Sequence, residues 1–439
     1  MSADIVNIPE PEVDPAGVGK PTVAEASWFW LKLGFISFGG PAGQIAILHT
    51  ELVQRRRWVS ENRFLYALNF CMLLPGPEAQ QLATYMGWLM HGVRGGVIAG
   101  GLFVLPSALF LWALSYAYVL WGTVPAVKAA FAGLQPAVLG LVVAAVYQMG
   151  RRVLRTPTHV GLCLGAFVVL QLKLVSFPVL VGLAGMFGWV VWRRKVGGLE
   201  SPRHPAIEDP QVDSSERFRL SGAWVTTVVG CLCLWWLPVV LAYGWLGPEH
   251  MVFKQGLFFS QTAMVTFGGA YAVLPYVAEQ AVERHGWLNA GQMLDGLGLA
   301  ESTPGPLIMV LQFVGFLGAW NHPGNLPAIA SATLGALITT WVTFLPSFLW
   351  IFGGAPFVER SRGLRWLVPV LAGITSAVCG VILSLATWSA RRVLWNEGTW
   401  APLWVWLVFA VAALGSVRWR LPVPWMVVGS IAVGILATG

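Results

Sequence analysis

The amino-acid sequence predicts an all-α protein that crosses a membrane several times, and three observations carry this prediction. Hydrophobic residues make up 56% of the 439 positions and charged residues only 11%. The mean hydropathy is +0.67, which leaves too little polar surface for a soluble domain. Apolar runs alternate with short loops, and a motif rich in glycine and proline occurs twice. We therefore expect two inverted-topology repeats, with short, broken or re-entrant helices at the Gly/Pro motifs.

The charge distribution fits a membrane protein better than a nucleic-acid-binding one. The net charge is +7, and the basic residues fall mainly in short loops between apolar runs, as the positive-inside rule requires. The five cysteines all lie within apolar stretches and lack zinc-like spacing, so we expect small buried hydrophobes. The sequence therefore predicts no metal, no cofactor and no nucleic-acid partner.

The order of apolar and polar segments suggests the domain organisation. A helical bilayer crossing needs about 20 apolar residues. Four shorter segments, 27–38, 42–57, 64–74 and 78–90, precede longer apolar runs that begin at residue 95. We divide the chain into a disordered cytoplasmic tail (1–24), an N-terminal transporter repeat (25–195), a cytoplasmic linker (196–220), an unrepeated transmembrane helix and loop (221–253) and a C-terminal transporter repeat (254–439).

Two fixed shifts relate the halves of the chain. A shift of 229 residues places Phe38-Gly39-Gly40 on Phe267-Gly268-Gly269, and Pro75-Gly76-Pro77 on Pro304-Gly305-Pro306. After a small insertion the shift becomes 240 and places Leu105-Pro106-Ser107 on Leu345-Pro346-Ser347. The arginine-rich loops occupy opposite phases in the two copies, which predicts opposite orientations in the membrane and a cytoplasmic N-terminus.

The Gly/Pro motifs indicate an anion site. Irregular backbone at membrane depth persists only where protein buries it or where it lines a cavity. Each motif precedes a helical pattern, and the N–H groups and dipole at a helix N-terminus favour an anion. The predicted substrate is therefore a small oxyanion. The predicted binding residues are Gly39, Gly40, Pro41, Gln44, Pro75, Gly76, Pro77, Gln80, Gln81, Gly268, Gly269, Pro304, Gly305 and Pro306, together with Arg55 and Arg284 as paired positive charges.

Some of these side chains also allow a purely structural interpretation. Arg55 and Arg284 would equally serve as interfacial anchors, and Arg55 is spaced for an i, i+4 pair with Glu51. Three acids in apolar surroundings, Glu78, Asp295 and Glu301, are predicted coupling or gating groups, because intramembrane carboxylates are generally functional. Glu78 would alternatively be a first-turn acid that the helix dipole stabilises.

Signatures of enzymes are weak in this sequence. It contains no His-Glu pair of metalloprotease type, no Gly-x-Ser-x-Gly and no phosphate-binding loop. We therefore expect a transporter rather than an enzyme. The alternative from another class is an intramembrane enzyme that uses the three carboxylates for acid–base chemistry, and the twofold repetition of the motif speaks against it.

The motif set resembles the chromate ion transporter family in its long, two-domain form, over essentially the whole chain. It consists of Phe-Gly-Gly-Pro-x-x-Gln at 38–44, Leu-Pro-Gly-Pro at 74–77 followed by Gln80 and Gln81, and the repeats at 267–269 and 303–306. The resemblance implies a bacterial inner-membrane secondary transporter that exports chromate and confers chromate resistance. A sulfate or molybdate carrier is the rival within the same class, because similar tetrahedral dianions present the same oxygens. A homodimer is compatible with the sequence.

The second copy departs from the family pattern. Ala270 replaces the proline, Val273 stands at the position of Gln44, and Leu307 stands at the position of Glu78. We therefore expect the first copy to provide more of the ligand contacts.

Overall fold

The computed structural model describes residues 21–38, 40–194, 222–358, 367–396, 399–419 and 421–438. The predicted linker, Gly39 and all but the last residues of the predicted tail lie outside this part of the chain. Within it, five helices are long and apolar enough to cross a membrane. The fold is helical except for a two-stranded antiparallel pair, in which β1 (Trp395–Asn396) bonds to β2 (Thr399–Trp400). The prediction of an all-α polytopic membrane protein is confirmed.

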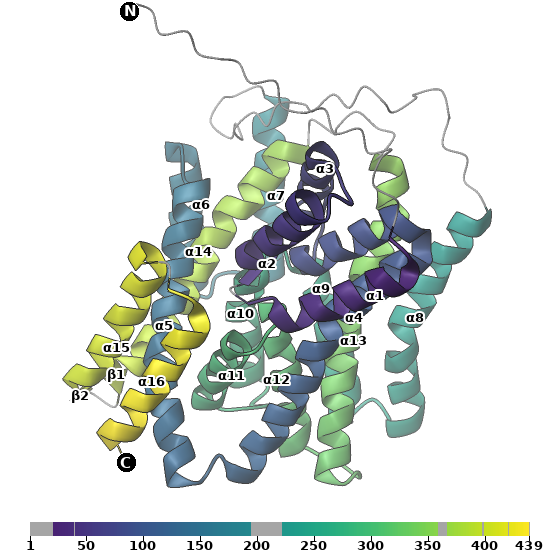
Figure 1. The fold of residues 1–439 in the computed structure, drawn as a ribbon. Coiled ribbons are helices and arrows are strands. Elements are labelled where there is room, and N and C mark those ends of the chain that lie inside the picture. The colour runs from purple at the N-terminus through teal and green to yellow at the C-terminus, as the bar shows by residue number, and fades with distance from the viewer. Residues whose placement is uncertain are drawn as a thin grey trace, which may run out of the picture.

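The first half of the chain forms eight helices in the order shown in Figure 1. They are α1 (Val23–Ile36), α2 (Gly40–His49) with a π-helical continuation η2 (Thr50–Arg55), α3 (Glu61–Cys71), α4 (Glu78–Trp121), α5 (Pro125–Val153), α6 (Pro157–Gln171), α7 (Phe177–Arg193) and the following α8 (Gly222–Leu246).

The second half repeats the order of α1 to α7. Its elements are α9 (Met251–Val265), α10 (Ala270–Ala278) with a π-helical continuation η3 (Glu279–Arg284), α11 (Ala290–Ser302), a 3₁₀ turn η4 (Leu307–Met309), α12 (Val310–Asn321), α13 (Ala328–Val358), α14 (Leu367–Val393), α15 (Leu403–Leu414) with η5 (Gly415–Trp419), and α16 (Val423–Thr438). The shift of 229 carries η2 onto η3 residue for residue.

Helix α4 joins two segments that the sequence predicts as separate helices. The backbone leaves helical geometry at His91 and Gly92, where Gly92 has φ +62°, a conformation that glycine adopts without steric cost. The second copy has a true break at the equivalent place, because α12 ends at Asn321 and α13 begins at Ala328. The added residues of that break explain why the shift changes from 229 to 240.

Contacts between α4 and α13 show that equivalent helices run in opposite directions. Gly96 lies against Phe352, and Gly100 lies against Phe348. Farther along α4, the indole N–H of Trp112 donates a hydrogen bond to Thr333 Oγ1 at 3.2 Å. Residue numbers rise along α4 as they fall along α13, so the two helices are antiparallel. Since α13 is the repeat mate of the second part of α4, the repeats have inverted topology.

The last two helices of each repeat pack on the other repeat. Helix α5 lies between α15 and α16 (Figure 1), and α14 contacts α6 and α7. Glycines make these contacts close. A Cβ atom on Gly133 of α5 would stand 2.1 Å from the carbonyl oxygen of Ser430, and one on the equivalent Gly373 of α14 would stand 2.5 Å from that of Ala184. We call the two helix pairs, α6 with α7 and α15 with α16, the exchanged arms, because each pair packs on the other repeat and so joins the two halves.

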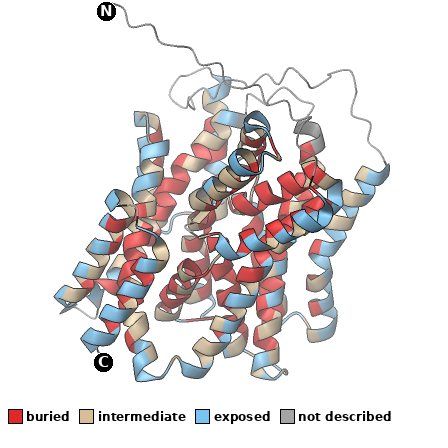
Figure 2. Ribbon diagram, in the orientation of Figure 1, coloured by how far each residue is buried: buried red, intermediate tan, exposed pale blue. Residues whose placement is uncertain are grey.

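The buried core lies where the two repeats meet. Figure 2 shows buried residues concentrated on the central helices α10, α11 and α12, and exposed residues on the outer helices such as α8 and α15. Phe259, Phe313 and Phe316 are completely buried there. The exposed outer faces are apolar, for example at Leu241, as a lipid-facing surface requires.

The exchanged arms give a first testable prediction. Replacing Gly133 by Leu should lower the thermal stability of the protein, because the side chain would collide with the backbone of α16. Overpacking of this kind costs about 1–3 kcal/mol or more. The matched control is Gly161→Leu on α6, where a Cβ meets no atom within 4 Å. Thermal melting in detergent measures both, and equal melting temperatures would contradict the packing described.

Candidate oxyanion site

The two Pro-Gly-Pro turns, at residues 75–77 and 304–306, lie where the two repeats meet, a region that we call the crossing. Each turn forms a backbone hydrogen bond with the other repeat. The N–H of Gly76 donates to the carbonyl oxygen of Thr266 at 2.7 Å. The N–H of Gly305, its repeat mate, donates to the carbonyl oxygen of Ser37 at 2.6 Å. Ser37 and Thr266 are themselves related by the shift of 229. Each turn therefore closes on the end of the first helix of the other repeat, as a pseudo-twofold axis requires.

Local sequence explains why the chain takes this shape. Ser37 and Thr266 end α1 and α9 with nearly identical backbone angles, φ −80° and ψ 87° against φ −81° and ψ 89°. Gly76 and Gly305 have φ +124° and +108°, a region that other residues rarely adopt. The flanking prolines have no N–H to satisfy, so the turns leave few unpaired groups in the membrane.

Two serines that the sequence flagged only as repeat anchors complete the turns. A Cβ on Gly76 would stand 3.2 Å from Ser347 Oγ of α13, and one on Gly305 would stand 2.5 Å from Ser107 Oγ of α4. Ser107 donates to the carbonyl oxygen of Val104, whereas Ser347 Oγ is buried without a partner in the described residues. The repeated Leu-Pro-Ser was the sequence signal for these residues.

Buried amide side chains gather around the first motif. Gln44 Nε2 donates to the carbonyl oxygen of Gly305 at 2.5 Å, and Gln81 Nε2 donates to that of Pro75 at 2.8 Å. Their Oε1 atoms have no partner among the described residues. Gln80 is fully buried, and neither its Nε2 nor its Oε1 has a partner there. Because an unpaired buried amide is costly, these atoms are candidate contacts for a polar ligand.

The free backbone donors lie in α4 rather than in the glycine turns. The N–H groups of Gly76 and Gly305 are both used to join the repeats. The first N–H groups of a helix have no intrahelical acceptor, and in α4 these belong to Glu78, Ala79 and Gln80. The arrangement can therefore hold an anion at the α4 N-terminus beside the Gln80 amide.

The second copy has an apolar surface at the corresponding place. The repeat mates of Gln44, Gln80 and Gln81 are Val273, Met309 and Val310, and all three are buried. The first turn there is η4, a short 3₁₀ turn. The glycine motif of the second copy still lies near the proline of the first, since a Cβ built on Gly269 would stand 3.9 Å from Pro41 Cγ. The scaffold is thus symmetric, but its polar side chains are not.

The structure places two of the three acids in buried tyrosine contacts. Asp295 accepts hydrogen bonds from Tyr118 at 2.8 Å and from Gln135 at 2.9 Å. Glu301 accepts a hydrogen bond from Tyr271. Sequence reasoning found the acids but not these partners, because the partners lie far away in the chain or carry no motif.

The third acid has a different environment. Glu78 is the first residue of α4 and is half-buried. The sequence alternative of a first-turn acid therefore describes its position correctly.

The two predicted arginines do not join this group. Arg55 donates to Glu51 at 2.6 Å, and its side chain is 71% exposed. Arg284 lies 4.0 Å from Glu279, and its side chain is 64% exposed. Both arrangements match the alternative of surface pairs near the helix ends. We leave both residues out of the buried site.

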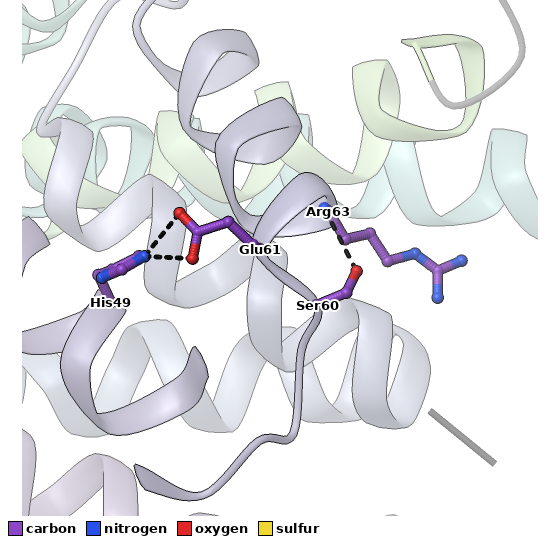
Figure 3. A network of polar contacts seen from close by, with 4 residues as sticks. All are labelled: His49, Ser60, Glu61 and Arg63. Atoms are coloured by element: carbon purple, nitrogen blue, oxygen red, sulfur yellow. Dashed lines mark hydrogen bonds and ion pairs between the residues drawn. The ribbon is translucent and has the colours of Figure 1, made fainter. Parts of the chain in front are cut away.

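The outer end of the first motif helix is held by a hydrogen-bonded contact between a histidine and a carboxylate. Figure 3 shows His49, at the end of α2, against both carboxylate oxygens of Glu61 at 2.8 and 2.7 Å. Ser60 caps α3 by accepting from the N–H of Arg63. The shift of 229 puts alanines in place of both His49 and Glu61. This contact therefore joins α2 to α3 in the first repeat and has no counterpart in the second repeat.

An open hollow elsewhere in the protein is less suited to a buried ligand. It has a volume of about 580 Å³ and is lined by Val282, Gly286, Leu288, Asn289, Ala290, Gln292, Asn321 and Arg392. None of these residues belongs to the repeated motifs. Groups of three or more potential metal ligands do not occur in the described part of the chain. We therefore place the candidate site at the crossing, where polar groups are buried and unpaired.

Comparison with known proteins agrees with this architecture. The model of the chromate transporter family matches two segments, residues 24–189 and 253–435. The chain belongs to the chromate transporter family. No solved structure matches it.

Three curated relatives cover most of the chain. A chromate transport protein of Cupriavidus metallidurans is 26% identical over 95% of this chain and 93% of its own length. A probable chromate transport protein of Synechococcus elongatus is 26% identical over 94% and 95%, respectively. A chromate transport protein of Pseudomonas aeruginosa is 31% identical over 83% and 81%. These full-length similarities extend the family assignment to both repeats.

The unpaired amide gives a second testable prediction. Replacing Gln80 by Met, the residue of its repeat mate, should leave thermal stability unchanged or raise it, because an unsatisfied buried amide disappears. The matched control is Gln312→Met. Gln312 Nε2 donates to the carbonyl oxygen of Ala108 and its Oε1 accepts from Thr340, so its loss should cost about 1–3 kcal/mol. A comparable loss in both variants, measured by thermal melting, would show that Gln80 has an ordinary packing role.

Proposed function

We propose that this transporter exports chromate across the bacterial inner membrane, with its N-terminus in the cytoplasm, and thereby confers chromate resistance. The observation that carries the proposal is the fully buried Gln80 amide, which has no partner among the described residues and lies in the first turn of a long helix. Similarity to chromate transport proteins over most of the chain supports chromate as the ligand. The distribution of arginines between the loops supports the orientation.

Neutral donors would bind the ion at this site. The N–H groups of Glu78, Ala79 and Gln80 and the Gln80 amide can donate to its oxygens, and the α4 dipole favours its charge. Gln44, Gln80 and Gln81 are at most 1% exposed, so the site is closed to water in this conformation. Release on either side therefore requires the repeats to move apart at the bonds of Gly76 and Gly305.

The membrane potential supplies a driving force for export. Moving one charge through 100 mV is worth about 2.3 kcal/mol, so an outgoing dianion gains about 4.6 kcal/mol at an inside-negative potential of that size. ATP is not needed for this step. The rival ligands sulfate and molybdate would use the same donors, and the enzyme alternative would need a reacting group besides the three carboxylates.

Flux measurements in sealed vesicles test the proposal. Purified protein in liposomes should move radiolabelled chromate faster when a potassium diffusion potential makes the destination side positive. Unlabelled sulfate or molybdate in excess should compete weakly if chromate is the physiological ligand. Strong competition would favour the rival carriers, and vesicles that move none of the three anions would refute oxyanion transport.

Two substitutions test whether chromate passes through the crossing. Gly76→Val should abolish chromate flux, because φ +124° and the nearby Gln81 and Ser347 leave no room for the side chain. Gln80→Met should reduce flux at least about tenfold at unchanged stability, since a lost hydrogen bond to a charged ligand is worth about 1.5–3 kcal/mol. Gly101→Val on α4, where a Cβ meets no atom within 4 Å, is the control for insertion. Normal flux in Gly76→Val would remove the turn from the mechanism.

A further inference from the structure

We propose that Glu301 and Tyr271 form a proton-binding site in the second repeat, and that a proton bound there promotes oxyanion binding in the first repeat. This inference rests on the proposed function, since it needs an oxyanion at the crossing. It assigns a second ligand, a proton, to a pair of residues that the anion site does not use. The two repeats would then bind ligands of opposite charge.

Comparison of equivalent positions is the first step. The repeat mates of Tyr271 and Glu301 are Ala42 and Met72, which cannot bind a proton. Conversely, the mates of the amides Gln44 and Gln80 are Val273 and Met309. One symmetric scaffold thus carries neutral hydrogen-bonding amides on one side and a carboxyl–phenol pair on the other.

Burial without a counter-ion is the second step. Glu301 is 8% exposed and accepts a hydrogen bond from Tyr271, a neutral donor. No lysine or arginine is buried among the residues that the structure describes. A buried carboxylate without a cation is costly and is relieved by binding a proton.

The surroundings of α11 supply no nearby buried cation. Helix α11 packs against α4, α5, α12, α16 and η4, and Tyr271 reaches it from α10. Within their bounds α12, α16 and η4 contain no Asp, Glu, His, Lys or Arg. The titratable groups on the other elements are Glu78, Tyr85, His91, Arg94, Tyr116 and Tyr118 of α4, Lys128, Tyr147, Arg151 and Arg152 of α5, Tyr276 of α10, and Asp295 of α11 itself.

Asp295, the other acid on α11, accepts more hydrogen bonds than Glu301 does, and these bonds stabilise its charged form. Asp295 accepts hydrogen bonds from both Tyr118 and Gln135, whereas a single donor, Tyr271, is bonded to Glu301. More donors favour the charged form of a carboxyl group. Glu301 is therefore the better proton acceptor of the two.

The pair is connected along the chain to both bonds that join the repeats. Glu301 lies four residues before Gly305, and Tyr271 lies five residues after Thr266. Four extended residues span at most about 14 Å. Gly305 is linked to the amides around the first motif through Gln44, which donates to its carbonyl oxygen. A dianion about 14 Å from a charged Glu301, in a medium of effective dielectric constant about 20, would bind tenfold or more weakly. By linkage, the bound oxyanion raises the affinity of Glu301 for a proton equally.

The test compares flux at several pH values in vesicles that contain wild type, Glu301→Gln, Glu301→Asp or Tyr271→Phe. Chromate itself takes up a proton, so every comparison is between variants at the same pH. Wild type should show a KM for chromate that falls tenfold or more as the pH is lowered. Glu301→Gln should have a low KM without this dependence, and Glu301→Asp should restore it.

The tyrosine variant supplies a readout that a structural role would not move. The Tyr271 hydroxyl donates to the carboxylate and so favours its charged form. In Tyr271→Phe the transition in KM should therefore shift to higher pH, by about one unit. Glu249→Gln is the control, since Glu249 pairs with Lys254 at 2.7 Å on an exposed loop and should leave the profile unchanged.

Several results would overturn the proposal. They are a wild-type pH profile in Glu301→Gln, or a shift to lower pH in Tyr271→Phe. If Glu301→Gln does not fold, calorimetry of chromate binding to wild type in buffers of different ionisation enthalpy decides the matter, and binding without proton uptake refutes the coupling. Absence of chromate flux in wild type at every pH would instead refute the proposed function.

Discussion

The structure depends on two backbone hydrogen bonds that exchange the same groups between the repeats. Gly76 bonds to Thr266 and Gly305 bonds to Ser37, each between a Pro-Gly-Pro turn and the end of a helix in the other half. Lipid offers no replacement for either bond, so these peptide groups must be paired within the protein. Neither repeat can satisfy its own turn, which makes the two halves obligatory partners. The exchanged arms around α5 and α14 extend the same dependence over the length of the molecule.

This constraint changes the role of the glycines. A glycine at a helix start usually allows a ligand to approach the backbone, but here the approaching group is a carbonyl of the other repeat. The free backbone donors then belong to the first turn of α4, next to Gln80, where we propose the anion site. In the proposed mechanism, the bonds that close the crossing also open during transport. The same residues can therefore seal the site and allow its opening, which a rigid anion pocket would not permit.

Symmetry of the backbone coexists with asymmetry of the side chains. The backbone repeats closely enough for η2 and η3 to have equivalent bounds. Yet the repeat mates of the three buried amides are valine or methionine, and the mate of Glu301 is Met72. A pseudo-twofold scaffold supplies two similar conformations for alternating access, inward-open and outward-open. Chemical asymmetry lets one ligand site serve both. Asp295 and Glu301 are buried without any buried lysine or arginine in the described residues, and this is the basis of the proton coupling that we propose.

Local and periodic features of the sequence determined much of this protein. Composition and apolar run length predicted a helical membrane protein, the two shifts predicted the repeats, and the arginine-rich loops predicted their opposite orientations. These properties depend on neighbouring residues and on duplication. The motifs also located the turns at Gly76 and Gly305. Only the tertiary structure decided that each turn bonds to the opposite repeat, that Ser347 and Tyr271 join the crossing, and that Arg55 and Arg284 stay at the surface. Those outcomes depend on contacts between residues far apart in the chain, where packing and the need to pair every buried polar group select the partner.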